Sequence, residues 1–264
     1  DIFIYRLYFH SSHSPSFPKN TPVIRFIFPF FIVYLNTLCY NHVQMNTTQT
    51  DSALQGGNMG LHYIPEGALL SAPTPFLYQN RLYAVCSRYL NDFFVEGEED
   101  GLFLLATDDG VHFTEHPLGI HAQSAAIISD PNGFHLFYTG EHEICHAISA
   151  SPMGPWKCAG PSIAPNPTIY KDCVWQDPWL WQDDAGIWHM ILGAEENKRI
   201  GRCGCIAHCT SDNLIDWVVH PPFYSPGSLI NAPASPCFFR IGETAYLLYT
   251  AQSDTPRQHY RFLP

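Results

Sequence analysis

The sequence is poor in basic residues, and no hydrophobic run in it is long enough to span a bilayer comfortably. Only 13 of its 264 residues are Lys or Arg, against 24 Asp or Glu, and the net charge is -11. Such a charge repels nucleic acid backbones and anionic membrane surfaces. We therefore expect no nucleic acid partner and no membrane, and a neutral ligand fits this charge better.

A regular cysteine framework is also missing. The nine cysteines are an odd number scattered along the chain, which favours reduced thiols in a cytoplasmic protein. Only Cys203, Cys205 and Cys209, with His208, lie close enough to suggest a metal site. Their spacing matches no standard zinc pattern, and an alternating strand would place Cys203 and Cys205 on one face as small hydrophobic residues. We predict no metal and no cofactor.

The first 44 residues differ in character from the rest. The segment Phe26–Tyr40 is almost wholly apolar and follows Arg25, so it could act as a signal-peptide core, and the protein would then be secreted. The first methionine, Met45, opens a polar stretch typical of a flexible N-terminus. We predict that residues 1–44 are an extension outside the domain, 45–60 a linker and 61–264 the folded domain.

After residue 60 a pattern repeats about every fifty residues. It consists of an apolar strand, a polar turn and a second apolar strand, at Phe76–Ser87, Ala126–Gly140, Trp179–Ala194 and Phe238–Ala251. A second hairpin turn follows the first three, at Ala106–Phe113, Ser149–Trp156 and Thr210–Trp217. Two hairpins make a four-stranded blade, so we predict an all-β propeller with about three and a half four-stranded blades. A β-sandwich is the alternative.

Propeller geometry limits where chemistry can occur, because the innermost strand of each blade begins at one end of the central channel. These starts fall near Ala72, Ser124, Asp177 and Ala234, and of these four only Asp177 carries a carboxylate. Trp175 and Trp179 flank it, and tryptophan rings are common platforms for sugars. We predict that Asp177 is a functional acid.

Other acids could join Asp177 only from loops at the same end of the propeller. Glu195 and Glu196 follow the second strand of the same repeat and are tentative catalytic residues. The acidic run within Asn91–Asp100 is a further candidate, although charge runs are usually solvated loops. Asp130, in Asp-Pro-Asn-Gly, is instead interpreted as a turn residue at the opposite end.

The segment Gln176–Pro178 resembles the Arg-Asp-Pro motif of glycoside hydrolase family 32, the invertases, levanases and related β-fructosidases. The opening His62–Val85 is similar to the first-blade stretch of that family, and the Asp-Pro motif is shared with families 43 and 68. The resemblance implies a five-bladed β-propeller in which Asp177 stabilises the transition state. It also implies that Trp175, Gln176 and Trp179 lie at the substrate.

The same resemblance implies two losses. The position of the nucleophilic Asp falls on Ala72 and that of the acid/base Glu on Ala234, while Gln176 replaces the Arg. Retaining glycosidases need two carboxylates, one as nucleophile and one as acid/base. Three functions remain open: a glycosidase acting on O-glycosidic bonds of fructosides or similar furanosides, a catalytically degenerate carbohydrate-binding propeller, and a protein-interaction scaffold.

Overall fold

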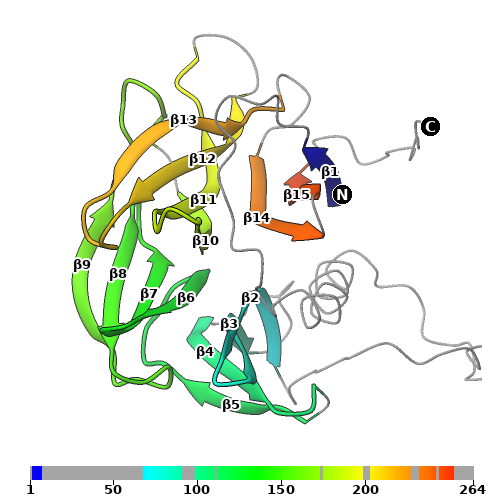
Figure 1. Ribbon diagram of the computed structural model, residues 1–264, viewed down its shortest axis with the longest axis vertical. Coiled ribbons are helices and arrows are strands. Elements are labelled where there is room, and N and C mark those ends of the chain that lie inside the picture. Colours follow the sequence, from blue (N-terminus) through cyan, green and yellow to red (C-terminus); the bar gives the residue numbers. More distant parts are fainter. Residues whose placement is uncertain are drawn as a thin grey trace, which may run out of the picture.

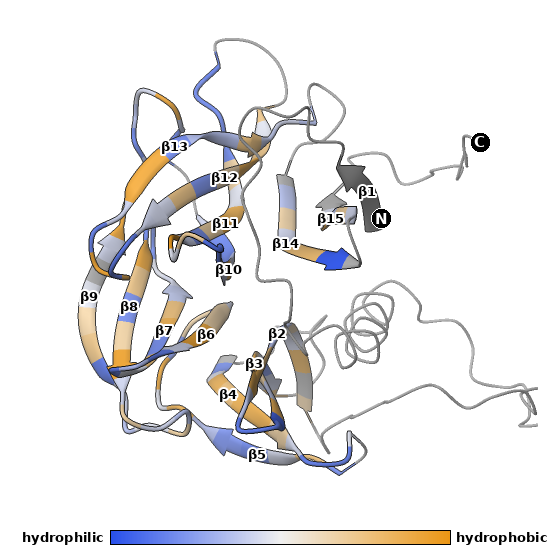
Figure 2. Ribbon diagram, viewed as in Figure 1, coloured by the Kyte–Doolittle hydropathy of each residue, from blue (hydrophilic) through white to orange (hydrophobic). Residues whose placement is uncertain are grey.

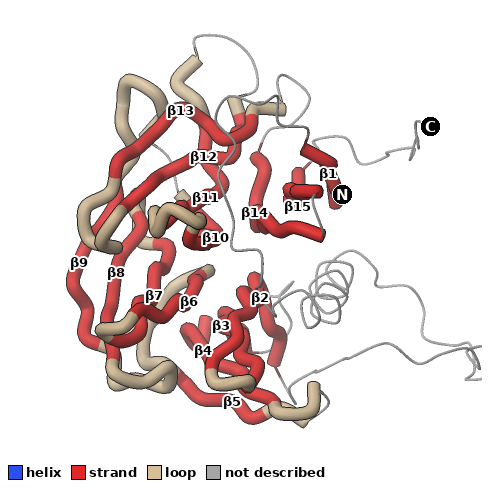
Figure 3. Tube along the Cα trace, in the orientation of Figure 1, coloured by secondary structure: helices blue, strands red, loops and turns tan. Residues whose placement is uncertain are grey.

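The computed structural model describes residues 2–7, 68–90, 99–110, 112–172, 175–198, 203–226, 232–241 and 244–252. Every regular element in these ranges is a β-strand (Figure 3). No helix long and apolar enough to cross a membrane occurs among the described residues. The all-β fold predicted from the sequence is therefore confirmed.

Three sheets have four antiparallel strands each, connected in sequence order (Figure 1). Blade 1 contains β2 (Ala68–Tyr78), β3 (Arg81–Leu90), β4 (Glu99–Thr107) and β5 (Thr114–Pro117). Blade 2 contains β6 (Ala125–Asp130), β7 (Gly133–Thr139), β8 (Ile144–Ser149) and β9 (Lys157–Ile163). Blade 3 contains β10 (Gln176–Gln182), β11 (Trp188–Glu195), β12 (Gly204–Ser211) and β13 (Val218–Tyr224).

The fourth sheet has three strands, in the order β1, β15, β14. The hairpin of β14 (Ala232–Ile241) and β15 (Thr244–Gln252) is the predicted half blade. The third position is taken by β1 (Ile2–Leu7), which pairs antiparallel with β15. The sequence predicted that residues 1–44 are an extension outside the domain, and β1 is the part of that range that the structure describes. The sequence also predicts a third strand of this blade at residues 259–264, which lie outside the described residues.

The four sheets follow one another around a centre, with β2, β6, β10 and β14 innermost (Figure 1). The recurring apolar hairpins predicted from the sequence are the pairs β2–β3, β6–β7, β10–β11 and β14–β15. Contacts run from blade 1 through blades 2 and 3 to the fourth sheet. This arrangement confirms the β-propeller architecture and brings the starts of the innermost strands together.

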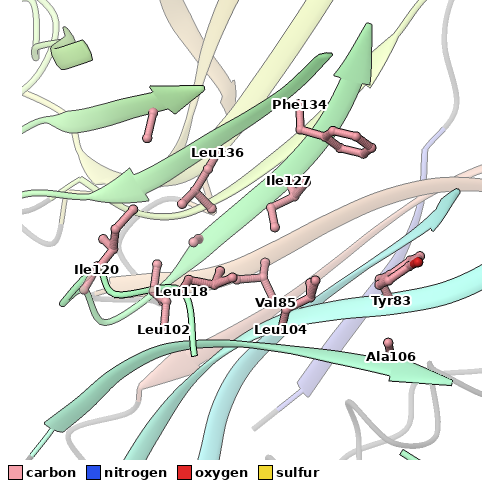
Figure 4. Packing of buried hydrophobic residues seen from close by; sticks show 13 residues of the cluster. Tyr83, Val85, Leu102, Leu104, Ala106, Leu118, Ile120, Ile127, Phe134 and Leu136 are labelled. Atoms are coloured by element: carbon pink, nitrogen blue, oxygen red, sulfur yellow. The ribbon is translucent and has the colours of Figure 1, made fainter. Parts of the chain in front are cut away.

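The hydrophobic core lies between the blades, because alternate residues of each strand point to opposite faces of its sheet. Between blades 1 and 2, Val85 and Leu104 of one blade face Ile127 and Leu136 of the other (Figure 4). A second cluster, around Trp175, fills the interface of blades 2 and 3, and a third joins blade 3 to the fourth sheet. The outer strand β5 is mostly hydrophilic (Figure 2).

Tyr170 ties the segment that enters blade 3 to the outermost strand of that blade. Its ring is fully buried, and its hydroxyl donates a hydrogen bond of 2.7 Å to the carbonyl oxygen of His220. We expect Tyr170→Phe to lower the free energy of unfolding by about 1 kcal/mol, because the His220 carbonyl loses its buried donor. Urea unfolding of the two proteins measures this difference, and an unchanged midpoint would contradict it.

Candidate functional site

A β-bulge interrupts the innermost strand of three of the four sheets at equivalent positions. The register shifts at the dipeptides Ala72-Pro73, Asp177-Pro178 and Ser235-Pro236. Proline has no N–H to donate to the neighbouring strand, so the ladder must skip there. The residue before each proline has a positive φ, of 48°, 58° and 50° respectively. Non-glycine residues rarely adopt this conformation, and such strain clusters at functional sites.

Asp177 is held by residues of the two neighbouring sheets. Its backbone N–H donates to Ser124 Oγ at 2.9 Å, just before β6 of blade 2. Its Oδ2 accepts hydrogen bonds from the N–H of Ser235, at 2.7 Å, and from Ser235 Oγ, at 2.9 Å, on β14. The carboxylate therefore lies where three innermost strands meet. Within the described part of the chain, Asp177 Oδ1 has no hydrogen-bond partner.

The second strand of each sheet carries a hydroxyl or a glycine opposite these starts. Ser87 donates to the carbonyl oxygens of Ala122 and Gln123, which lead into blade 2. Thr139 Oγ1 lies 2.6 Å from Ser124 Oγ, and Thr250 donates to the Ala234 carbonyl oxygen at 3.1 Å. Gly193 occupies the corresponding place in blade 3. These contacts fix the channel end of the blades.

Ala72 lies in β2 and Ala234 in β14, at or next to the β-bulge of each strand. Both side chains are half-buried. Ala72 occupies the same bulge position as Asp177, while in β14 this position belongs to Ser235, with Ala234 one residue before it. An alanine methyl group can neither attack a sugar carbon nor transfer a proton. The strained backbone thus persists in three sheets, but only blade 3 presents a carboxylate on it.

Trp175 was predicted to lie at the substrate, but its side chain is fully buried. The ring packs edge to face against Tyr170, at 5.3 Å between centroids, inside the core between blades 2 and 3. A ligand cannot stack on it without unfolding this core. Trp179 is half-buried and donates from Nε1 to the Phe238 carbonyl oxygen at 3.1 Å, so it packs blade 3 against β14. Gln176 is also half-buried.

Glu195 lies at the same end of blade 3 as Asp177, because β11 ends where β10 begins. Its Oε2 accepts a hydrogen bond of 2.7 Å from Lys171 Nζ, and this bond raises the pKa of the lysine. Glu196 pairs with Lys198 and accepts a hydrogen bond of 2.7 Å from Ser225 Oγ. Both carboxylates are therefore held by lysine ammonium groups, and neither is turned toward Asp177 by a contact with it.

The other candidates have structural roles where they are described. Asp100 pairs with Arg88 at 3.6 Å, whereas Asp92, Glu96 and Glu98 lie outside the described residues. Asp130 Oδ1 accepts the N–H groups of Asn132 and Gly133, which makes it the turn residue that the sequence predicted.

The cysteines of β12 do not assemble with His208. Cys203 is buried just before β12, and Cys205 and Cys209 are buried within it. Cys205 and Cys209 face blade 2, whereas His208 stacks on the opposite face of the sheet. No group of three or more metal-binding side chains is found among the described residues.

Ser235 and the row of hydroxyls were not predicted from the sequence, and Ser124 was predicted only as a strand start. Their signal is the repeat itself, since aligning the four hairpins puts Ser87, Thr139, Gly193 and Thr250 in one column. The hydrogen bonds from Asp177 to Ser124 and from Ser235 to Asp177, together called the clamp, join residues 53 and 58 positions apart in the sequence. No local pattern reveals such contacts.

Four radial sheets with a strained acid at their channel end define a β-propeller with a carboxylate beside its axis. The profile of the glycosyl hydrolases family 32 N-terminal domain matches residues 62–259, most of the chain. The protein therefore belongs to glycosyl hydrolase family 32. No curated protein matches the sequence.

Solved structures share the fold. The GH32 β-fructofuranosidase BmSUC1 of Bombyx mori matches with a TM-score of 0.59 and 18% identity, over 71% of this chain and 42% of that one. Fructan 1-exohydrolase IIa of Cichorium intybus, in complex with 1-kestose, matches with a TM-score of 0.57 and 17% identity, over 72% of this chain and 42% of that one. A family 43 arabinoxylan arabinofuranohydrolase of Bacillus subtilis matches with a TM-score of 0.54 and 15% identity, over 74% of this chain and 48% of that one. The chain thus spans less than half the length of these proteins.

Proposed function

We propose that the protein binds a carbohydrate of the fructoside or similar furanoside class through Asp177, as a member of its family that has lost the nucleophile. The observation that carries this proposal is the clamp on Asp177. Two hydrogen bonds from Ser235 occupy Oδ2, which leaves Oδ1 as an acceptor for a ligand hydroxyl. An acceptor-only group of this kind suits a neutral polyol.

The equivalent positions support binding over cleavage. Ala72 has the backbone conformation of Asp177 without its carboxylate, and Ala234 has none either. Cleavage with retention needs a second carboxylate at about 5 Å, and inversion needs one at about 6.5–9.5 Å. Within the described residues, no second carboxylate shares the clamp.

Hydrolysis of an O-glycosidic bond is the second candidate, and the position of Glu195 favours it. This residue lies at the channel end of blade 3, the same blade as Asp177. If Lys171 released it, Glu195 could supply the acid. In that case Asp177 would orient the sugar and Glu195 would protonate the leaving oxygen.

Calorimetry and a reducing-sugar assay on the full chain distinguish the two. We expect sucrose, levan, inulin or arabino-oligosaccharides to bind without release of sugar. Asp177→Asn should weaken binding by about 10- to 100-fold, because a hydrogen bond to a charged group contributes about 1.5–3 kcal/mol. Asp184→Asn, at an exposed carboxylate of the β10–β11 turn, is the matched control and should bind normally.

Two results would change the conclusion. Sugar release that Glu195→Gln abolishes and Glu196→Gln retains would establish the second candidate. Equal binding by the wild type and Asp177→Asn would exclude Asp177 as the ligand-binding acid.

A further inference from the structure

A ladder of aromatic rings crosses all four strands of blade 3, on the face turned toward the fourth sheet. Trp181 of β10 stacks on His189 of β11, with centroids 4.9 Å apart, and His189 stacks on His208 of β12 at 5.3 Å. His220 of β13 follows at 5.1 Å. Hydrogen bonds follow the same line: Asp183 Oδ2 accepts from His189 Nε2 at 3.2 Å, and His189 Nδ1 lies 3.0 Å from His208 Nε2.

Blade 2 contains the same device at the same places. Asp130 Oδ1 lies 3.3 Å from His135 Nε2, and His135 Nδ1 lies 3.0 Å from His146 Nε2. The imidazole rings stack at 5.1 Å, and Phe137 stacks on His146 at 4.5 Å. In both blades the acid closes the first hairpin and the histidines occupy corresponding register positions.

Each ladder can hold only a limited number of protons. The aspartate accepts the Nε2–H of the first histidine, which is His135 in blade 2 and His189 in blade 3. Nδ1 of this first histidine then accepts the Nε2–H of the second histidine, His146 or His208. One extra proton at Nδ1 of the first ring can be accommodated if the second ring changes tautomer, so that its Nε2 becomes the acceptor. Two extra protons would set one N–H against another across 3.0 Å and place two cations in stacking contact. A fully protonated ladder is therefore incompatible with the packed interface.

The surroundings offer little compensation for such charge. In blade 3 the titratable groups along the ladder are Asp183 and His220, and β14 and β15 add Arg240 and Tyr249 from the packed sheet. In blade 2, Asp130 is the one acid of the ladder. The facing cluster of blade 3 contributes Tyr170, Cys205 and Cys209, all neutral groups.

The two ladders lie at the same interfaces that hold Asp177. Its N–H bond to Ser124 crosses from blade 3 to blade 2, and its bonds from Ser235 cross to the fourth sheet. We propose that the paired Asp–His–His ladders make the interfaces of blade 3 sensitive to acid. Their full protonation separates blade 3 from its neighbours and breaks the hydrogen bonds that Asp177 makes with Ser124 and Ser235. This inference goes beyond carbohydrate binding and is independent of any ligand.

The direction of the effect follows from the buried histidines. Burial, then the charge of His189 and of His220, lowers the pKa of His208 to about 3, and burial with His135 lowers that of His146 to about 4. Because both values lie below the ordinary 6.5, the unfolded chain binds more protons than the folded one between pH 6.5 and these values. Stability is therefore complete above pH 6.5 and is lost as the pH falls.

Unfolding equilibria of the full chain in urea from pH 7.5 to 4.5 test the device. For each ladder we expect the unfolding constant to rise about tenfold per pH unit below pH 6. His208→Gln keeps a donor toward His189 but cannot be protonated. The unfolding constant of this variant should therefore rise about tenfold less per pH unit than that of the wild type. His121→Gln, at an exposed histidine, is the matched control and should keep the wild-type dependence.

Two measurements on the wild type keep the proposal testable if His208→Gln does not fold. In ¹⁵N-histidine spectra, His208 and His146 should stay neutral down to pH 5. Hydrogen exchange should show the amides of Asp177 and Ser235 losing protection at a higher pH than that of Leu104 in β4. Protonation of His208 in the folded protein above pH 5, or equal loss at all three amides, would overturn the proposal.

Discussion

Replacing Trp175 with alanine should cost about 3–5 kcal/mol of the free energy of unfolding, because the change empties a large volume in a closed core. The indole is fully buried between blades 2 and 3 and contacts the ring of Tyr170. A domain of this size is stable by about 5–15 kcal/mol, so the loss would be a large part of the total. Urea or thermal unfolding measures it directly.

Trp175→Phe separates packing from hydrogen bonding at this position. Within the described residues Trp175 Nε1 is buried without a hydrogen-bond partner, so phenylalanine removes an unsatisfied donor while keeping most of the ring. We expect this variant to cost less than half as much as Trp175→Ala. The comparison also tests whether Trp175 belongs to the binding site. Loss of sugar binding in a fully stable Trp175→Ala protein would place the ring at the ligand and contradict the core assignment.

The fold could be predicted from the sequence because its signal is local and repeated. An apolar strand, a polar turn and a second apolar strand recur four times, and each forms the hairpin expected, for example Ala126–Gly140 as β6 and β7. Strand pairing within such hairpins is set by the turn and by alternation. The contribution of Ile2–Leu7 to the fourth sheet had no such signal, since about 240 residues separate it from β15.

The candidate site could be predicted only in part. Asp177 was found because it is the one carboxylate at the four strand starts, and its strained conformation agrees with a functional position. Trp175 was assigned to the ligand because it neighbours that acid in sequence. Burial decides its role instead, and burial depends on how blades 2 and 3 pack against each other, which no local pattern shows.

The histidine ladders show the same limit. The acid and the two histidines of each blade are visible in the sequence, but only the register of β7 with β8 and of β11 with β12 brings the rings together. A one-residue slip would turn one ring to the opposite face and remove the stack.

A side chain at Gly193 should be strongly destabilising, because the start of β14 passes closer to this residue than a Cβ atom allows. A Cβ atom at this position would lie 2.5 Å from the carbonyl oxygen of Pro233 and 3.5 Å from Ala234 Cα. Both contacts are backbone, so no side-chain rotation relieves them. We expect Gly193→Ala to cost about 1–3 kcal/mol or more, since the fourth sheet must move away from blade 3.

The same movement should reach Asp177. Ser235, which donates twice to its carboxylate, lies two residues beyond Pro233 on the displaced strand. Gly193→Ala should therefore weaken carbohydrate binding as much as Asp177→Asn, even where the variant remains folded. Calorimetry on both proteins, at a temperature where unfolding shows each to be native, measures this.

Ser87→Ala is the matched control, because it changes the equivalent position of blade 1 without adding a Cβ atom. It removes the hydrogen bonds to the Ala122 and Gln123 carbonyl oxygens and should cost about 1 kcal/mol, but it leaves β14 and the two hydrogen bonds from Ser235 to Asp177 in place. If Gly193→Ala bound carbohydrate as well as Ser87→Ala, the approach of Pro233 to Gly193 would not be what holds Ser235 against Asp177. The clamp would then depend on the strained bulge at Asp177 and Ser235 alone.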